Sequence, residues 1–174
     1  MDLKVIDNFL PPYQFQQIQS ILMEDTFPWF YNRHANADSY GFEIGTYHGR
    51  SVFQFTHTLF HDGPPWNGVG SNYYSIVQNC ISGLDIKKLY RIKINLLTPT
   101  LFHQNTGWHC DNCGDASRTA VYYINTNNGY TKFKKGPKVK SVANRMVIFD
   151  SQSAHAGFTS TNTNTRVVIN FNYD

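Results

Sequence analysis

The sequence predicts a mainly β, α+β fold: a jelly-roll (double-stranded β-helix, cupin-like) barrel flanked by N-terminal helices. Helical periodicity is confined to the first half of the chain, whereas the second half carries short segments rich in Val, Ile, Tyr and Phe with the two-residue period of strands. Turn residues separate these segments, notably around Gly129 and at Gly136-Pro137. Short antiparallel strands that must bury a common core close most naturally into a barrel of this kind.

The first half of the chain is predicted to hold two helices. Over residues 13–23, apolar residues recur at three- and four-residue steps, which predicts a helix with one buried face. A short strand or turn is expected to stop at Pro11-Pro12, just before this helix. Residues 27–31 are aromatic and fit a strand entry, and residues 32–49 are rich in Asn, Gly, His and Tyr and fit a loop with short strands. A second, shorter helix is predicted around residues 73–81.

Four segments of the second half are predicted strands: residues 90–97, 119–125, 145–149 and 166–173. In the first of these segments, the apolar side chains face one way and the polar ones face the other, the polar set being Arg91, Lys93 and Asn95. The last segment alternates in the same way, and its polar-facing set is expected to be Arg166, Val168 and Asn170. The opposite face is expected to pack in the core through Val167, Ile169, Phe171 and Tyr173.

Length and composition indicate one domain, residues 1–174. The chain has 41% hydrophobic and 16% aromatic residues, enough apolar volume for a packed core, which excludes a disordered protein. We find no repeat and no linker. Residues 1–88 are expected to supply helical and loop support and the substrate region, and residues 89–174 the barrel core with the metal site.

Charge and cysteine content narrow the classes of partner and compartment. The net charge is only +3, which gives no case for nucleic-acid binding. A lysine cluster surrounds Gly136-Pro137 and consists of Lys132, Lys134, Lys135, Lys138 and Lys140. It is interpreted as a solvated hairpin edge, and contact with an acidic substrate is the alternative. The chain shows no signal peptide and no membrane span, and its three cysteines are too few for a disulfide framework. We therefore expect a soluble, cytoplasmic protein without a membrane partner.

A candidate metal site centres on the segment Trp108-His109-Cys110-Asp111. On an extended backbone, residues two apart share a face, so His109 and Asp111 point the same way. A third ligand must come from elsewhere, and His155 is the candidate because it follows a predicted strand and a polar loop. Two histidines and one carboxylate on one face of an octahedron leave the opposite face open, as non-haem Fe(II) oxygenases require. A His-x-Asp pair arises readily by chance, so the pair alone is a weak signal.

Arg166 strengthens this hypothesis because it opens the last predicted strand. An arginine that enters a barrel is costly unless it is paired, and a dicarboxylate ligand offers a bidentate, charge-assisted pair. The alternative is an exposed arginine on an edge strand.

Together and in order, the motifs around these residues resemble the 2-oxoglutarate (2OG)/Fe(II)-dependent dioxygenase superfamily, especially its prolyl-hydroxylase-like branch and the small members found in phage genomes. The resemblance covers residues 89–173 and, more loosely, residues 5–11. The matching segments are His109-Cys110-Asp111, Ala120-Val121-Tyr122-Tyr123-Ile124-Asn125, Asn128-Gly129-Tyr130-Thr131, Asn144-Arg145-Met146-Val147-Ile148-Phe149, His155 and Thr165-Arg166-Val167-Val168.

The resemblance implies hydroxylation of a C–H bond in a peptidyl (prolyl-like) or small-molecule substrate, with release of succinate and CO2. The implied cofactors are Fe(II), the co-substrate 2OG and O2, with ascorbate as a stimulant. His109, Asp111 and His155 would be the catalytic metal ligands, and Arg166 and the Tyr123 hydroxyl would bind the distal carboxylate of 2OG. A phage-encoded member would act in the host cytoplasm.

Two departures from the family pattern and two alternative functions stay open. The tyrosine usual some ten residues before the first ligand is absent; Pro99 and a longer loop replace it, and Asn95 is the candidate for its role. In the segment that resembles the family's Gly-Gly turn, Asn128 stands in place of the first glycine. One alternative is a zinc site built from Cys110 and Cys113 with two histidines. The other is a non-catalytic, cupin-like module that binds a metal or ligand. The sequence does not specify the substrate or the oligomeric state.

Overall fold

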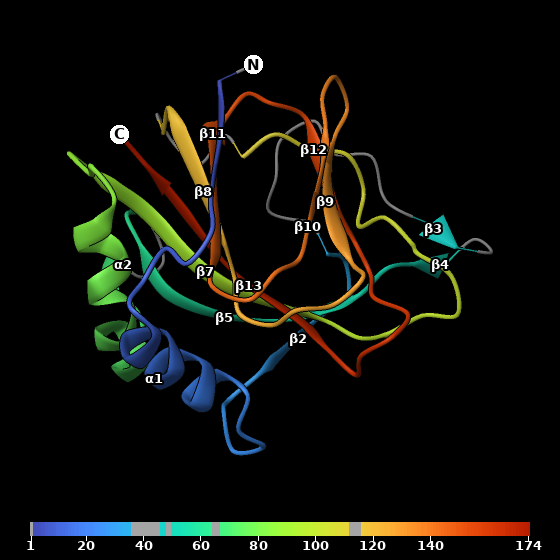
Figure 1. The fold of residues 1–174 in the computed structure, drawn as a ribbon, viewed down its shortest axis with the longest axis horizontal. Helices are drawn as coiled ribbons and strands as arrows, with labels where there is room; N and C mark the ends of the chain where they lie inside the picture. Colours follow the sequence, from blue (N-terminus) through green and yellow to red (C-terminus); the bar gives the residue numbers. More distant parts are fainter. Residues whose placement is uncertain (1, 36–45, 48–49, 64–66, 112–115) are drawn as a thin grey trace.

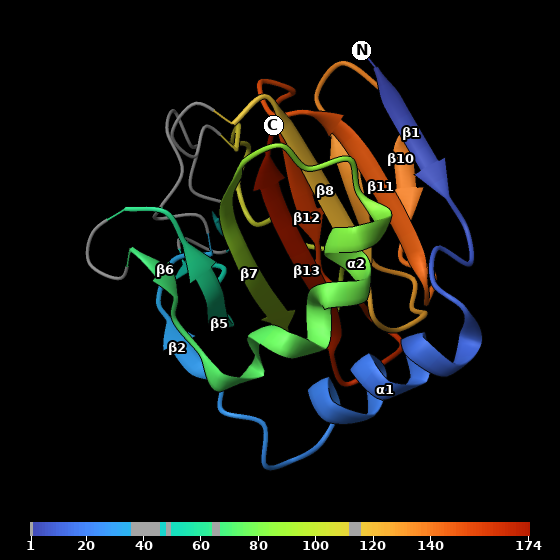
Figure 2. The same ribbon diagram turned by 90° about the vertical axis from the view of Figure 1, so that its left-hand side faces the viewer.

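A large and a small antiparallel sheet face each other, and helices cover the outer face of the large one (Figures 1 and 2). The computed structural model describes residues 2–35, 46–47, 50–63, 67–111 and 116–174. This arrangement confirms the predicted jelly-roll class, with a mainly β domain and helices from the first half of the chain.

The strands of the large sheet follow the order β1-β11-β8-β13-β7-β5-β2, with β6 paired to β5. Their bounds are β1 Leu3–Ile6, β2 Phe30–Asn32, β5 Gln54–His61, β6 Gly68–Val69, β7 Leu89–Leu97, β8 Arg118–Tyr123, β11 Arg145–Asp150 and β13 Arg166–Tyr173. The small sheet has the order β10-β9-β12, with β9 at Tyr130–Phe133, β10 at Lys138–Lys140 and β12 at His155–Phe158. A separate hairpin pairs β3 (Thr46–Tyr47) with β4 (Arg50–Ser51).

Three helical segments pack on the outer face of the large sheet, as Figure 2 shows: α1 (Pro12–Leu22), η1 (Asn72–Val77, a 3-10 helix) and α2 (Gln78–Gly83). Proline begins α1, where its missing N–H leaves no bond unmade. The buried face of α1 consists of Phe15, Ile18 and Leu22. These side chains pack in one apolar core with the outward-facing residues of β7 and β13. Helical segments occur at both predicted places, with α1 over the first range and η1 and α2 over the second.

Strands β7 and β13 alternate as the sequence predicts. Their outward side chains, including Ile94, Ile169 and Phe171, are fully buried in the core under the helices. Their inward side chains face the small sheet. A second apolar cluster fills the part of the barrel between the large sheet and the small sheet. Its buried residues are Val121, Tyr123, Phe133, Val139, Val147, Phe149 and Val168. The rest of the interior is lined mainly by polar side chains, and the candidate site lies there.

The first 88 residues also contribute strands to the large sheet. β5 pairs with β7 over most of its length, and β1 pairs with β11 at the other edge. Sequence patterns do not predict β5, which carries polar residues among its apolar ones. Of residues 32–49, predicted as loop with short strands, 36–45 and 48–49 lie outside the described residues, and the remainder includes the β3 strand of the β3-β4 pair.

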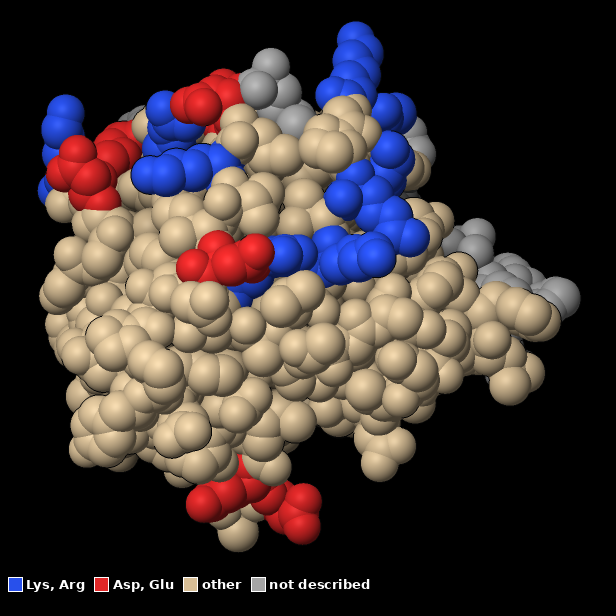
Figure 3. Space-filling model, viewed as in Figure 1, with Lys and Arg blue, Asp and Glu red and all other residues tan. Residues whose placement is uncertain are grey.

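The lysine cluster lies on the β9-β10 hairpin, which confirms the predicted hairpin edge. β10 is an edge strand, and Lys138 and Lys140 are exposed on it around the buried Val139. Figure 3 shows basic side chains gathered in a band on this face, while most of the surrounding surface is uncharged. Charged side chains on an edge strand discourage pairing with other chains. No helix in the described part of the chain is long and apolar enough to cross a membrane.

Candidate active site

The two candidate histidines lie side by side at one end of the barrel. The segment that leads to His109 runs antiparallel to β12, and the backbones of His109 and His155 exchange N–H···O bonds of 3.0 and 2.9 Å. Their ring centroids are 4.4 Å apart, and both residues are buried. Two segments far apart in sequence therefore meet where the predicted metal site requires them to meet.

Backbone carbonyls orient both imidazoles. The Nδ1 atom of His109 is 3.1 Å from the Gly107 carbonyl oxygen, and that of His155 is 2.9 Å from the Ser153 carbonyl oxygen. A carbonyl oxygen can only accept, so each Nδ1 carries a proton, and Nε2 is the ring nitrogen that faces the cluster and could bind a metal. Metal-ligating histidines are commonly held in this way, by a hydrogen bond to the second ring nitrogen.

Asp111 completes the cluster. Its Oδ1 is 3.6 Å from Nε2 of His109, and its Oδ2 is 3.6 Å from Nε2 of His155. The Asp111 backbone N–H donates to the Ser151 carbonyl oxygen at 3.0 Å, which fixes the carboxylate beside the histidines. The candidate ligand atoms of the three residues all lie within 4.8 Å of one another. Because the Oδ2 atom is buried without a hydrogen-bond partner, the cluster has an unfilled acceptor at its centre.

The electrostatics of the cluster suit a cation. Burial, reinforced by the neighbouring His155, lowers the pKa of His109 to about 4, so this imidazole is neutral near pH 7. Burial alone would raise the pKa of Asp111, but the attraction of His155, His109 and Arg91 outweighs it and the pKa is lowered. A neutral imidazole and an ionised carboxylate are the forms in which these side chains bind metals.

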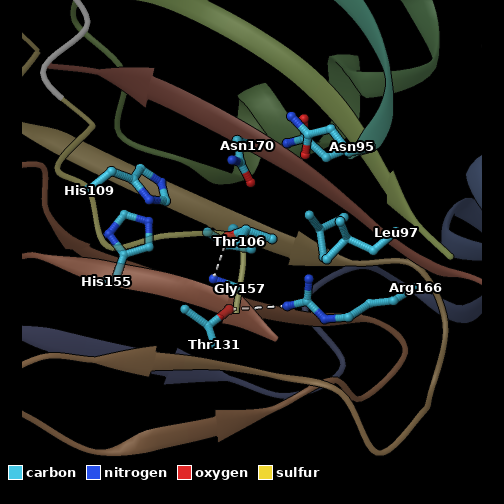
Figure 4. Close-up of a pocket in the computed structure, with 12 residues that line it drawn as sticks. Asn95, Leu97, Thr106, His109, Thr131, His155, Gly157, Arg166 and Asn170 are labelled. Carbon is cyan, nitrogen blue, oxygen red and sulfur yellow. Dashed lines mark hydrogen bonds between the residues drawn. The ribbon is translucent and has the colours of Figure 1, made fainter. Parts of the chain in front are cut away.

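A cavity extends from this cluster to Arg166, as Figure 4 shows. His109 and His155 line one end, and Arg166 and Thr131 line the other. The walls come from β5, β7, β8, β13, the small sheet and the segment that leads to His109. The wall residues are Gln54, Asn95, Leu97, Thr106, Val121, Gly157, Val168 and Asn170.

Arg166 is a buried cation held by neutral groups. Its Nε donates to the Ser141 hydroxyl at 2.8 Å, its Nη2 donates to the Thr131 hydroxyl at 3.2 Å, and its guanidinium carbon is 5.5 Å from the Tyr123 ring centroid. Among the described residues, no carboxylate forms an ion pair with it. Because a buried charge without a counterion is costly, this end of the cavity fits an anion.

Two glycines leave room for the arginine and the cavity. A Cβ at Gly129 would lie 2.7 Å from Cδ of Arg166 and 2.9 Å from the Phe158 carbonyl oxygen, so no larger residue fits there. A Cβ at Gly157 would lie 3.6 Å from Nη1 of Arg166 and would narrow the cavity. The turn that resembles the family's Gly-Gly turn thus needs its glycine at the second position.

Tyr123 lies beside the cavity rather than along its wall. Its hydroxyl donates to Thr131 at 2.8 Å, and Thr131 also accepts from Arg166. Asn95 does line the cavity, and its Oδ1 atom is buried without a partner. The structure therefore places Asn95 where a ligand can reach it, and places Tyr123 in support of the arginine.

Several residues of the site carry no distinguishing sequence pattern. Thr131, Ser141 and Thr106 are small hydroxyl residues in polar stretches, and nothing in their local pattern distinguishes them. Strand alternation does assign Asn170 to the inner face, and its Oδ1 atom is also buried without a partner. That alternation is the signal that could have placed Asn170 in the site.

Cys110 does not join the cluster. Its thiol donates to the Gln152 carbonyl oxygen at 3.2 Å, and its sulfur is not among the converging ligand atoms. Cys113 lies outside the described residues. The ligand set that the structure brings together is two imidazoles and one carboxylate, which is the set typical of non-haem Fe(II) sites.

Comparisons with solved structures point to the same architecture. A Burkholderia pseudomallei oxidoreductase of the 2OG-Fe(II) oxygenase family superimposes with a TM-score of 0.66 at 11% identity, over 99% of this chain and 84% of that one. A Pseudomonas putida prolyl-4-hydroxylase gives 0.59 at 14% identity, over 99% and 92%. The 2OG-dependent carbocyclase SnoK of nogalamycin biosynthesis gives 0.61 at 13% identity, over 98% and 78%.

Sequence comparison adds nothing to this likeness. No family model matches the chain, and no curated protein matches it. At identities of 11 to 14% the structural likeness establishes the fold alone. The chain has the jelly-roll fold of the 2OG-Fe(II) oxygenases.

Proposed function

We propose that the protein is a non-haem Fe(II)- and 2OG-dependent dioxygenase that hydroxylates a C–H bond and releases succinate and CO2. One observation carries the proposal: a single cavity has a two-histidine, one-carboxylate cluster at one end and a buried arginine at the other. A dicarboxylate that binds a metal through one end and an arginine through the other fits both ends at once.

The residues of the chain have separable tasks in this reaction. His109, Asp111 and His155 would hold Fe(II), which when bound supplies the activation of O2 that protein side chains cannot provide. Arg166 would grip the distal carboxylate of 2OG, with Thr131 and Ser141 fixing the plane of its guanidinium. The apolar walls at Leu97, Val121 and Val168 would exclude water from the reacting end, and Asn95 and Asn170 offer polar contacts between the two ends.

The substrate class is proposed as peptidyl, prolyl-like, or a small molecule. The likeness to a prolyl-4-hydroxylase and to a carbocyclase of nogalamycin biosynthesis supports both classes. Peptide substrates would need an extended contact surface, which the segments before residue 88 would supply.

Succinate formation tests the proposal directly. Purified protein with Fe(II), 2OG and O2 is expected to release succinate slowly without substrate, and faster with a substrate found by screening prolyl peptides and small molecules. Omission of Fe(II), or addition of a chelator, should abolish release. If the protein binds Fe(II) and 2OG but forms no succinate with any candidate, it is a binding module of the cupin type and the proposal is wrong.

A further inference from the structure

Three polar residues form a row across the inner face of the large sheet, next to Asp111. Asn172 on β13 pairs with Arg91 on β7 and with Thr119 on β8, so the three side chains stand at one level on three neighbouring strands. All three are buried, with Thr119 and Asn172 completely inaccessible. A row of buried polar side chains is costly unless every member is satisfied.

Hydrogen bonds run along the row in one direction and end on Asp111. Arg91 Nε donates to Asn172 Oδ1 at 3.0 Å, and Asn172 Nδ2 donates to Thr119 Oγ1 at 3.0 Å. Thr119 lies beside Asp111, and its hydroxyl helps to lower the pKa of that carboxyl by hydrogen bonding. Because a carboxylate only accepts, the Thr119 hydroxyl is the donor toward Asp111.

The row treats the two carboxylate oxygens of Asp111 differently. Arg91 Nη2 lies 3.8 Å from Oδ1, whereas Oδ2 is buried without any partner. Oδ1 therefore faces the Arg91 guanidinium, whereas Oδ2 is left without a hydrogen-bond partner beside His155.

The positive charge of Arg91 also balances the negative charge of the buried Asp111 carboxylate. The Asp111 side chain is 1% exposed, and a carboxylate at that depth needs a nearby cation. In the metal-free protein Arg91 supplies it, and a metal ion bound by the two histidines would supply it as well. Arg91 and the metal therefore compensate the same buried charge.

We propose that Arg91, Asn172 and Thr119 act as one positioning row, which holds Asp111 by Oδ1, presents Oδ2 to the metal and balances the carboxylate while the metal is absent. The inference rests on the metal centre of the proposed function and concerns how that centre is prepared before metal arrives. The three residues touch neither substrate nor metal; they act through Asp111.

Cobalt binding by Thr119 variants tests the positioning. Co(II) is titrated anaerobically into the full chain, and binding is followed by its visible d–d absorption, which also reports coordination geometry. Thr119→Val keeps the shape and the charge but removes the donor, and should raise the Co(II) dissociation constant about tenfold or more, as losses of such supporting groups do. Thr119→Ser keeps the hydroxyl and should restore binding and spectrum. Equal Co(II) binding in Thr119→Val and Thr119→Ser overturns the positioning role.

Melting temperatures of Arg91 variants test the charge balance. Arg91→Gln should lower the melting temperature of the metal-free protein, and saturation with Co(II) should recover most of the loss, because the metal replaces the missing cation. Arg91→Lys should lie between Arg91→Gln and the unmodified chain. Arg118→Gln, which removes an exposed arginine paired to Asp2, controls for loss of any arginine. Equal losses in the metal-free and Co(II)-saturated Arg91→Gln protein would show an ordinary structural role and overturn the charge balance.

The unmodified chain separates the two proposals. If it binds no Co(II), the metal centre itself is absent, and the proposal of a positioning row is wrong as well. If it binds Co(II) and only the variants fail to respond in these ways, the row is wrong and the metal centre stands.

Discussion

The two faces of β7 and β13 are built for different purposes. Their outer face is predominantly apolar and mostly buried under the helices, through residues such as Ile94, Ile169 and Phe171. Their inner face is also largely inaccessible but carries Arg91, Arg166 and other polar residues. Burial of apolar groups stabilises a fold, whereas burial of charges and amides does so weakly or not at all. The outer face therefore carries most of the stability, and the inner face carries the polar groups of the candidate site.

Buried polar atoms that lack a hydrogen-bond partner also gather on the inner side of the large sheet. Among the described residues, three of the four buried side-chain atoms without a hydrogen-bond partner belong to Asn95, Asp111 and Asn170. Asn95 and Asn170 line the cavity, and Asp111 lies in the metal cluster. Buried polar atoms are nearly always paired in proteins, so three exceptions in one place indicate a ligand site.

The largest effect is expected from a change at the cluster on the inner side. His109→Ala should reduce Fe(II)- and 2OG-dependent succinate formation to background while leaving the melting temperature near that of the unmodified chain, because His109 contributes a ligand and little apolar packing. His103→Ala, an exposed histidine of the same loop, is the matched control and should keep full activity. Succinate formation that survives His109→Ala would remove this residue from the metal site.

A change on the outer face should lower stability and leave metal binding unchanged. Phe171→Ala deletes a fully buried ring and should lower the free energy of unfolding by about 3–5 kcal/mol, measured by denaturant titration. The fraction that remains folded should bind Co(II) as the unmodified chain does. A selective loss of metal binding without a loss of stability would contradict the division between the faces.

Arg166 should affect the co-substrate and not the metal. Arg166→Met removes a charge-assisted contact worth about 1.5–3 kcal/mol, so the 2OG concentration for half-maximal turnover should rise about 10- to 100-fold. The Fe(II) requirement should stay the same, because the guanidinium lies at the far end of the cavity. Superimposable 2OG titrations for the variant and the unmodified chain would show that the arginine serves structure alone.

The smallest effect is expected at Asn170. Asn170→Val removes a buried oxygen that has no partner, so the free energy of unfolding should rise by about 1 kcal/mol. The affinity for 2OG, measured by calorimetry with Co(II) present, should fall because the cavity loses a polar wall. A drop in stability would mean that the inner face contributes to the fold more than its contacts indicate.

The sequence predicts much of the fold because its strongest patterns are local. The alternation in β7 and β13 is enough by itself to place the polar set on one face, and the period of α1 does the same for its buried face. β12 is weakly patterned because it is short and contains Gly157, and β5 carries His, Gln and Thr among its apolar residues. Their positions are set by pairing with β9 and β7, which local propensity does not encode.

The candidate site is predictable where a motif fixes it. His109 and Asp111 share a face by spacing. His155 and Arg166 are candidates because of their positions next to predicted strands, and the family resemblance supports both of them. The contacts of Arg91 with Asp111 and of Ser141 with Arg166 join segments that are distant in sequence. Residue spacing therefore does not predict these contacts. The resemblance implies that Tyr123 binds 2OG directly, and that role stays a proposal: its hydroxyl is engaged by Thr131.

One anaerobic titration tests most directly whether a metal and 2OG share this cavity. Fe(II) and 2OG together should give the unmodified chain a weak visible charge-transfer band that neither gives alone. Asp111→Ala should show no band, and Arg166→Met should show it only at higher 2OG. A band of equal strength in Asp111→Ala, or none in the unmodified chain at saturating Fe(II) and 2OG, would contradict the account.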